Sequence, residues 1–209
     1  WSPLVDRMTL PIFTAFFGRR RGWMIFAQLC LIGAIIGLST SDPIEDLERL
    51  AICALLLAFA SATQDIVIDA FRIESAPEKM QAALAAAYQV GYRSAMIVAT
   101  AGALTIAAWV SPDNLEYNLA SWQTAYFIMA LLMSVGLITA LFAKEPLVDT
   151  KEADEEERQL QMRFAERYPD KVAKAFAWIY CASVLPFSDF FRRYGKTAIL
   201  ILLLISCYR

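Results

Sequence analysis

An apolar run that begins at Leu50 ends with three charged residues at helical spacing, Asp65, Asp69 and Arg72. At ~100° per residue, these three positions share one face of a helix. A carboxylate at the centre of a bilayer costs roughly 2.5–3.5 kcal/mol on insertion scales, so it generally serves a polar pathway or a structural ion pair. The spacing therefore predicts a polar stripe along a membrane-spanning helix.

Depth separates the members of this stripe. If Arg72 marks the end of the span, Asp69 lies about 4–5 Å inside it and Asp65 about 10 Å inside, at ~1.5 Å per residue. Asp69 and Arg72 can therefore simply cap the helix. Asp65, with Gln64 beside it, forms either a structural hydrogen-bonded pair or part of a substrate or proton site. Ala62 would act through its small size, by letting a substrate or a neighbouring helix approach.

A second charge, Arg93, lies about 16 Å along the next apolar block at ~1.5 Å per residue. Near the bilayer centre a cation must face protein, water or a counter-ion, and Asp65 is the expected partner. Its guanidinium can donate two parallel hydrogen bonds, so it could bind an anionic group of a substrate. Alternatively, it could release Asp65 to take up a proton. The chain contains no His, so proton transfer would depend on carboxylates.

Long apolar blocks must position these residues. Hydrophobic residues make up 58% of the 209-residue chain and charged residues 19%. Their arrangement in uninterrupted blocks is typical of an integral membrane protein. The blocks long enough to cross ~30 Å of hydrocarbon are residues 23–39, 50–71, 82–109 and 122–142. We therefore predict an all-α fold, a polytopic transmembrane helix bundle with these four spans.

The charges between the blocks alternate in sign and so orient the bundle. The first and third connections are basic, whereas the second is acidic. The first contains Arg7, Arg19, Arg20 and Arg21, and the third contains Arg72 and Lys79. The second contains Asp42, Glu45, Asp46 and Glu48. Lys and Arg are concentrated in cytoplasmic loops. The pattern predicts that the basic connections lie in the cytoplasm.

The remaining segments are predicted to form cytoplasmic loops and the ends of further helices. Residues 1–22 should hold the end of a helix and a basic loop, residues 144–195 a loop with an amphipathic helix, and residues 196–209 the truncated start of another transmembrane helix. The mixed charges of residues 151–158 favour a solvated helix or linker. Residues 172–185 are apolar but short, which favours an interfacial helix over a span. We expect the chain to be a fragment whose partners are membrane lipid and the missing remainder of its own chain.

Several classes of function are not expected. The cysteines, Cys30, Cys53, Cys181 and Cys207, lack the spacing of metal ligands, so no metal and no cofactor is predicted. No nucleophile stands beside a base, so the chain is not expected to be an enzyme. No nucleic acid is expected as a partner.

Four motifs identify a resemblance to a known family. They are WSPLVDR at residues 1–7, GRRRGW at residues 18–23, SATQDIVIDA at residues 61–70 and GYR at residues 91–93. In this order they resemble the AmpG-type muropeptide permeases of the major facilitator superfamily. The resemblance covers residues 1–146 and resumes at residue 189, and the acidic segment between them matches poorly.

The resemblance implies a secondary active transporter of the bacterial inner membrane. Such a protein imports anhydromuropeptides, which are peptidoglycan fragments, together with protons, for cell-wall recycling and beta-lactamase induction. The four spans would be helices three to six, and residues 144–195 would join the two halves of the transporter. Asp65 would couple protons, and Ala62, Gln64 and Arg93 would contact substrate.

The resemblance also suggests a role for charges at the cytoplasmic side. Asp6, Arg7, Arg19 and Arg20 look like the superfamily signature between the second and third helices, although ten residues separate Arg7 from Gly18 here. Together with Asp69 and Arg72, they are assigned to gating or structural charge. Two alternatives to muropeptide import remain: a carrier of another anionic solute such as acetyl-CoA, and a membrane receptor or scaffold.

Overall fold

The computed structural model of the chain describes residues 5, 8, 10–111, 117–146, 151–165, 169–195 and 197–208. All secondary structure in these residues is helical, and the chain forms two compact units, made mainly of residues 8–147 and 148–209. The first unit contains four helices that are long and apolar enough to cross a membrane. The predicted all-α transmembrane helix bundle is confirmed.

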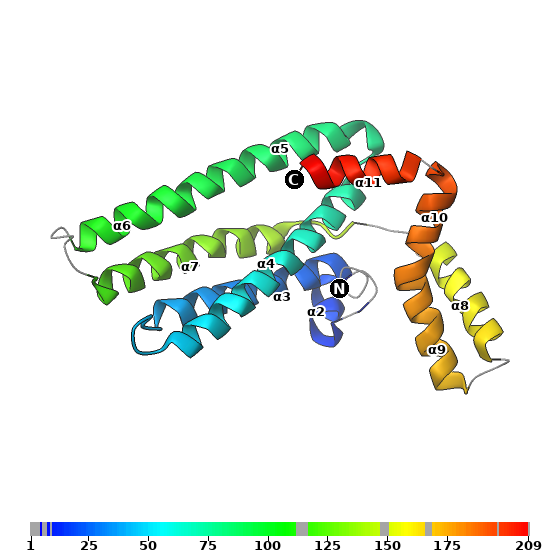
Figure 1. Cartoon of the computed structure of the whole chain (residues 1–209), viewed down its shortest axis with the longest axis horizontal. Helices are drawn as coiled ribbons and strands as arrows, with labels where there is room; N and C mark the ends of the chain where they lie inside the picture. Colours follow the sequence, from blue (N-terminus) through cyan, green and yellow to red (C-terminus); the bar gives the residue numbers. More distant parts are fainter. Residues whose placement is uncertain are drawn as a thin grey trace. The chain divides into compact units, whose positions relative to one another are not determined.

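The helices of the first unit follow one another with short connections (Figure 1). They are α2 (Pro11–Phe17), α3 (Arg19–Ser39), α4 (Leu47–Ser75), α5 (Glu78–Ile97), the π-helical segment η1 (Val98–Gly102), α6 (Ala103–Val110) and α7 (Leu119–Phe142). Segments α5, η1 and α6 form one continuous helix. The helices extend past the predicted spans by up to four residues at an end, because polar residues continue the backbone hydrogen bonding beyond the hydrocarbon.

The expected basic loop within residues 1–22 is partly wrong, because most of its described residues are helical. Pro11 begins α2, where its missing N–H costs nothing. Gly18 then ends α2 with φ 89° and ψ 173°, a conformation that is essentially limited to glycine. The chain re-enters a helix at once, so Arg19 and Arg20 lie in the first turn of α3.

Helix α3 is the central element of the first unit, with α2, α4 and α7 packed against it. Its buried residues include Met24, Ile25 and Leu31. The facing surfaces of α4 and α7 are lined largely by small residues: Ala60 and Thr63 on α4, and Ser121, Ala125, Ala130 and Ala140 on α7. Small side chains let membrane helices approach closely, so these surfaces determine where α4 and α7 lie.

The hairpin between α4 and α5 has a well-defined turn. Ala76 is extended and Pro77 follows it, which ends α4 because the residue before proline disfavours the helical conformation. The Gln81 amide then donates to the carbonyls of Ile73 and Ala76, at 2.9 and 2.8 Å. Figure 1 shows α4 and α5 joined at this turn and diverging away from it, and none of the residues of α5 is buried.

The second unit is also helical. It contains α8 (Lys151–Ala165), α9 (Asp170–Ile179), the π-helical segment η2 (Tyr180–Val184), α10 (Leu185–Tyr194) and α11 (Thr197–Tyr208). Helix α9 packs against α8 through the ring of Phe164, whose centroid lies 6.3 Å from that of Phe176 and 6.5 Å from that of Tyr180. Residues 144–195, predicted to hold a solvated helix or linker and an interfacial helix, contain α8, α9, η2 and α10.

Candidate functional site

The two faces of α4 differ in polarity. Ala60, Thr63 and Val67 are buried and lie on one face. Asp65 and Asp69 lie about half a turn away, on a face that is exposed in this structure. We call the surface formed by Ala62, Asp65, Asp69 and Arg72 the polar face of α4.

An ion pair forms at one end of the polar face. Arg72 Nη2 lies 3.2 Å from Asp69 Oδ1, at a spacing of three residues. The guanidinium of Arg72 also lies over the ring of Tyr88 on α5, with 5.6 Å between Cζ and the ring centroid. An arginine in this position is stabilised both by the carboxylate and by the ring quadrupole. Arg72 is therefore held where α4 and α5 meet.

Two tyrosines of α5 continue the polar surface. The rings of Tyr88 and Tyr92 stack with centroids 6.5 Å apart, as expected for residues one helical turn apart. Tyr88 also contacts the polar face directly, since its ring lies under the guanidinium of Arg72. The polar face of α4 and the two tyrosines of α5 thus form one surface that combines anionic, cationic and aromatic groups.

Gln64 lies at the edge of the polar face and is half-buried. Its amide oxygen Oε1 is buried and accepts no hydrogen bond from the described residues. Buried acceptors are generally satisfied, and leaving one unpaired costs about 1–3 kcal/mol. Gln64 therefore presents an unused acceptor beside Asp65. Ala62, two residues before it, is half-buried as well.

The expected contact between Arg93 and Asp65 is not observed. Arg93 lies near the middle of the continuous helix Glu78–Val110 and is exposed. Within the described ranges it makes no hydrogen bond or ion pair. The physical reason lies in the hairpin, because α4 and α5 diverge away from their connecting turn (Figure 1).

A second group of charges joins three helices at one end of the bundle. We call it the basic-end cluster; its described members are Arg19, Arg20, Arg21, Glu74 and Glu145. Arg20 donates from Nε and Nη2 to the two carboxylate oxygens of Glu74, at 2.9 and 2.5 Å. Both side chains are largely buried, and Arg19 lies 3.9 Å from the same carboxylate. This two-pronged contact ties the start of α3 to the end of α4.

Glu145 holds the same end of α3 to the segment after α7. Its two carboxylate oxygens accept from the backbone N–H groups of Arg20 and Arg21, at 2.8 and 3.0 Å. A carboxylate at a helix N-terminus satisfies unpaired N–H groups and interacts favourably with the positive end of the helix dipole. Gly18 leaves room for it, since a Cβ there would lie 2.6 Å from Glu145 Cδ. The Arg21 side chain donates in turn to the carbonyls of Ala140 and Leu141 on α7.

Some predicted site residues lie together and others do not. Asp69 and Arg72 form an ion pair, and Ala62, Gln64 and Asp65 lie on the same helix nearby. Arg19 and Arg20 belong to the basic-end cluster. Asp6 and Arg7 lie outside the described residues. Among the residues that are described, no group of His, Cys, Asp and Glu is placed to hold a metal ion.

The sequence prediction missed Glu74, Glu145, Tyr88 and Tyr92. Glu74 carries a usable signal, because an acidic residue in the last turn of a helix opposes the dipole and calls for a nearby cation. Glu145 caps a helix more than a hundred positions earlier in the chain, and no local pattern predicts such a contact.

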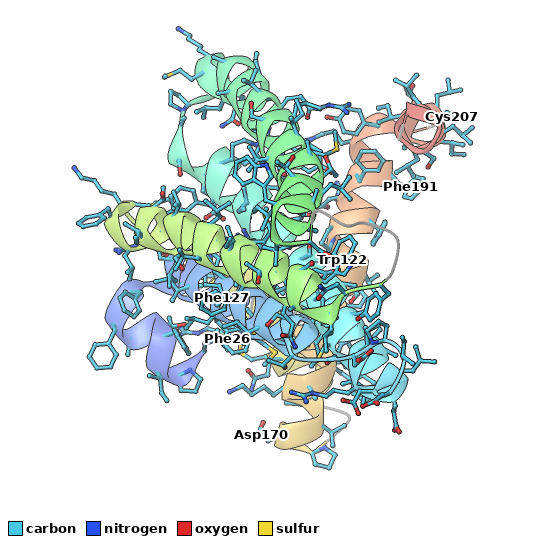
Figure 2. The ribbon with its side chains drawn as sticks, turned by 90° about the vertical axis from the view of Figure 1, so that its left-hand side faces the viewer. Phe26, Trp122, Phe127, Asp170, Phe191 and Cys207 are labelled. Carbon is cyan, nitrogen blue, oxygen red and sulfur yellow. The ribbon has the colours of Figure 1, made fainter. Side chains whose placement is uncertain are left out.

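A hollow of about 380 Å³ lies at the other end of the bundle. Its walls come from the end of α3, the start of α4 and the start of α7, and include Leu50, Trp122 and Tyr126. The rings of Trp122 and Tyr126 lie 6.4 Å apart, and Figure 2 labels Trp122 on α7. This hollow contains none of the predicted site residues, so it does not form part of the polar face.

Comparison with known proteins identifies the type of protein. Residues 1–208 match the family model described as Major Facilitator Superfamily. The chain is 36% identical over all 209 residues to the protein of Escherichia coli K12 named "Anhydromuropeptide permease", of which it covers 35%. It is 30% identical over 209 residues to "Putative transporter AmpG 4" of Rickettsia felis, of which it covers 44%. The chain thus spans a third to a half of the length of these relatives. No solved structure is matched with significance.

Proposed function

Because the chain belongs to the Major Facilitator Superfamily, and is a multi-pass protein of the bacterial inner membrane, we propose that the protein imports anhydromuropeptides together with protons. The observation that carries this proposal is the 36% identity, over all 209 residues, to a relative named as an anhydromuropeptide permease. Uptake of these peptidoglycan fragments would serve cell-wall recycling and beta-lactamase induction. Transport, rather than catalysis, is the activity proposed.

The polar face of α4 supplies the groups that such a transporter needs. In alternating access, the two halves of a transporter rock about a site near the bilayer midplane. We assign proton coupling to Asp65, since protonation would remove its charge and with it any attraction to a cation. The unused acceptor of Gln64 suits a sugar hydroxyl or a peptide amide. Ala62, three residues before Asp65 on the polar face, keeps the approach to Asp65 open.

Arg93 is assigned to an anionic group of the substrate. It is exposed near the middle of its helix and has no described partner, so its guanidinium has donors available. A substrate carboxylate would accept two parallel hydrogen bonds from it. This assignment replaces the direct pairing with Asp65 that the sequence predicted.

The basic-end cluster is assigned to the cytoplasmic gate. Its arginines favour a cytoplasmic position for that end of the bundle, according to the positive-inside rule. Arg20, Glu74 and Glu145 hold the ends of α3, α4 and α7 together, which supports a role in keeping this end of the bundle rigid while the transporter changes conformation. The proposal includes Asp6, Arg7 and Arg19 in the same charge group.

Uptake of labelled anhydromuropeptide tests the proposed function. The full-length protein is expressed in a strain without its own permease, and accumulation is measured with and without a proton uncoupler. We expect accumulation that the uncoupler abolishes and that Asp65→Asn abolishes as well. Glu48→Gln is the matched control, since Glu48 is an exposed carboxylate in the first turn of the same helix. Accumulation by Asp65→Asn at the normal level would remove Asp65 from the coupling step.

A carrier of another anionic solute, such as acetyl-CoA, is the second candidate. The exposed guanidinium of Arg93 favours any substrate with an anionic group, so it does not separate the two. Competition does: unlabelled acetyl-CoA should leave muropeptide uptake unchanged, whereas unlabelled muropeptide should suppress it. The reverse result would favour the second candidate. A protein that binds a partner without any uptake would be a receptor or scaffold.

A further inference from the structure

Helix α10 in the second unit has a continuous aromatic face. Phe187, Phe190, Phe191 and Tyr194 occur at the spacing i, i+3, i+4 and i+7, which places them on one side of a helix. The ring centroids of Phe190 and Phe191 lie 5.9 Å apart, and those of Phe190 and Tyr194 lie 5.1 Å apart. Three of the four side chains remain exposed, Phe187 to 61%. Figure 2 shows Phe191 projecting from the side of the α10 ribbon.

The opposite side of α10 is charged. At ~100° per residue, Asp189 lies opposite the aromatic face, and Arg192 and Arg193 lie on either side of Asp189, between it and the aromatic face. All three side chains are exposed. Neither arginine makes an ion pair or hydrogen bond with a described residue. Together with Asp189, Phe190 and Tyr194, the two arginines line an open hollow of about 790 Å³. Cations also suit a helix C-terminus, but the dipole alone does not account for an aromatic face of four residues beside them.

The helix that follows shows what lies next to this surface. Gly195 turns the chain with φ 51°, and α11 begins at Thr197. The sequence of α11, TAILILLLISCY, is apolar on all sides, and Leu200 and Leu204 are 66% and 73% exposed. A helix that is apolar all round is typical of a membrane interior. Helix α10 therefore ends where the chain passes from water into hydrocarbon.

We propose that α10 lies in the plane of the membrane surface and binds the headgroups of anionic phospholipids through Arg192 and Arg193. Phe187, Phe191 and Tyr194 insert at the boundary of the acyl chains, where aromatic rings are favoured. The guanidinium groups reach the lipid phosphates and can donate to them in pairs. The positive-inside rule agrees with this arrangement, because it places arginines next to a membrane-entering helix on the anionic cytoplasmic leaflet.

The position of α10 is tested by spin labels on opposite sides of the helix. Phe191→Cys and Asp189→Cys are made in a background in which the four native cysteines are replaced, and each labelled protein is reconstituted in lipid vesicles. The label at position 191 should be accessible to oxygen and protected from a water-soluble nickel chelate, whereas the label at 189 should show the reverse. Equal accessibility of both labels to the nickel chelate would overturn the proposal.

Lipid selectivity is tested separately. Wild type and R192Q/R193Q are reconstituted in phosphatidylcholine containing phosphatidylglycerol, extracted with detergent, and analysed by native mass spectrometry for retained lipid. Each arginine near an anionic surface is expected to contribute about a fivefold preference, so the ratio of retained phosphatidylglycerol to phosphatidylcholine should fall by at least that factor in the variant.

A matched control is available on α8. R158Q/R163Q removes the same two charges from exposed positions of that helix and should retain phosphatidylglycerol at the wild-type ratio. An equal loss of phosphatidylglycerol in both variants would show that the effect depends only on net charge, and would overturn the proposal. Inorganic phosphate is then added to the detergent-solubilised protein. Displacement of the retained lipid by phosphate would reassign the arginines to a soluble anion, and would also overturn it.

Discussion

At the scale of single residues, the polar side chains on and near the polar face differ in whether they pair with a described neighbour. Asp69 and Arg72 pair with each other, and Tyr88 adds a ring contact to the arginine. Gln64 keeps an unused acceptor, and Arg93 keeps unused donors, in the part of the chain that the structure describes. An unpaired donor or acceptor is available to a ligand, and pairing a buried one is favourable. This difference is why substrate contact is assigned to Gln64 and Arg93.

Replacing the glycine before α3 should destabilise the bundle. Gly18 has φ 89° and ψ 173°, and a Cβ there would lie 2.6 Å from Glu145 Cδ. Gly18→Ala must therefore strain the backbone and displace the cap, at a cost of roughly 1–3 kcal/mol for the backbone conformation. We expect a lower apparent melting temperature in detergent, followed by circular dichroism. Gly33→Ala is the control, since its Cβ would meet no atom within 4 Å; an equal effect of both substitutions would contradict the explanation.

The contact between Arg20 and Glu74 should appear as a coupling energy. A double-mutant cycle with Arg20→Ala and Glu74→Ala is expected to give an interaction on the order of 2 kcal/mol, because the cycle isolates this two-pronged, largely buried contact from the other contacts of each side chain. The apparent unfolding free energy in detergent is the measured quantity. Arg21→Ala combined with Glu74→Ala serves as the control, because the Arg21 side chain binds carbonyls of α7 instead. A coupling as large in this second cycle would show that the effect does not arise from the pair.

The sequence predicted those site residues that depend on local spacing. Asp69 and Arg72 are three positions apart, so any helix brings them together. The contact of Glu145 with α3 and the contact of Tyr88 with Arg72 depend on how helices pack, which a single sequence does not show. The predicted pair of Asp65 and Arg93 failed for the same reason, because the divergence of α4 and α5 is a property of their packing.

At the scale of elements, the spans were predicted well because length and hydropathy suffice for them. Roughly 17 or more predominantly apolar residues are needed to cross hydrocarbon, and each of the four blocks meets that requirement. Two features were missed. The π-helical segment Val98–Gly102 contains no Pro that would indicate an irregular helix. The short helix Pro11–Phe17 lies between charged residues that were interpreted as a loop.

Close packing of α3 on α4 can be tested by enlarging one side chain at the contact and shortening the one that faces it. A Cβ on Gly37 would lie 2.7 Å from Cys53 Sγ but 3.7 Å from Cys53 Cβ. Gly37→Ala should therefore destabilise the protein by roughly 1–3 kcal/mol, the usual cost of overpacking. The double variant Gly37→Ala/Cys53→Ala should recover most of that loss, since the sulfur is removed. Thermal unfolding of both variants in detergent provides the measurement, and failure of the second substitution to rescue the first would show that α3 and α4 approach each other differently.

At the scale of the whole molecule, helix α8 of the second unit can be separated from the proposed transport activity. The polar face, the tyrosines of α5 and the basic-end cluster all belong to residues 8–147, and α8 contributes none of them. Replacing residues 151–165 in the full-length protein by a flexible polar segment of equal length should therefore leave muropeptide uptake unchanged. The same replacement combined with Asp65→Asn should abolish uptake, because the coupling carboxylate is lost while the linker remains. If the replacement alone stops uptake while the amount of protein in the membrane is unchanged, α8 takes part in the function. That result would favour the receptor or scaffold alternative over transport by the polar face alone.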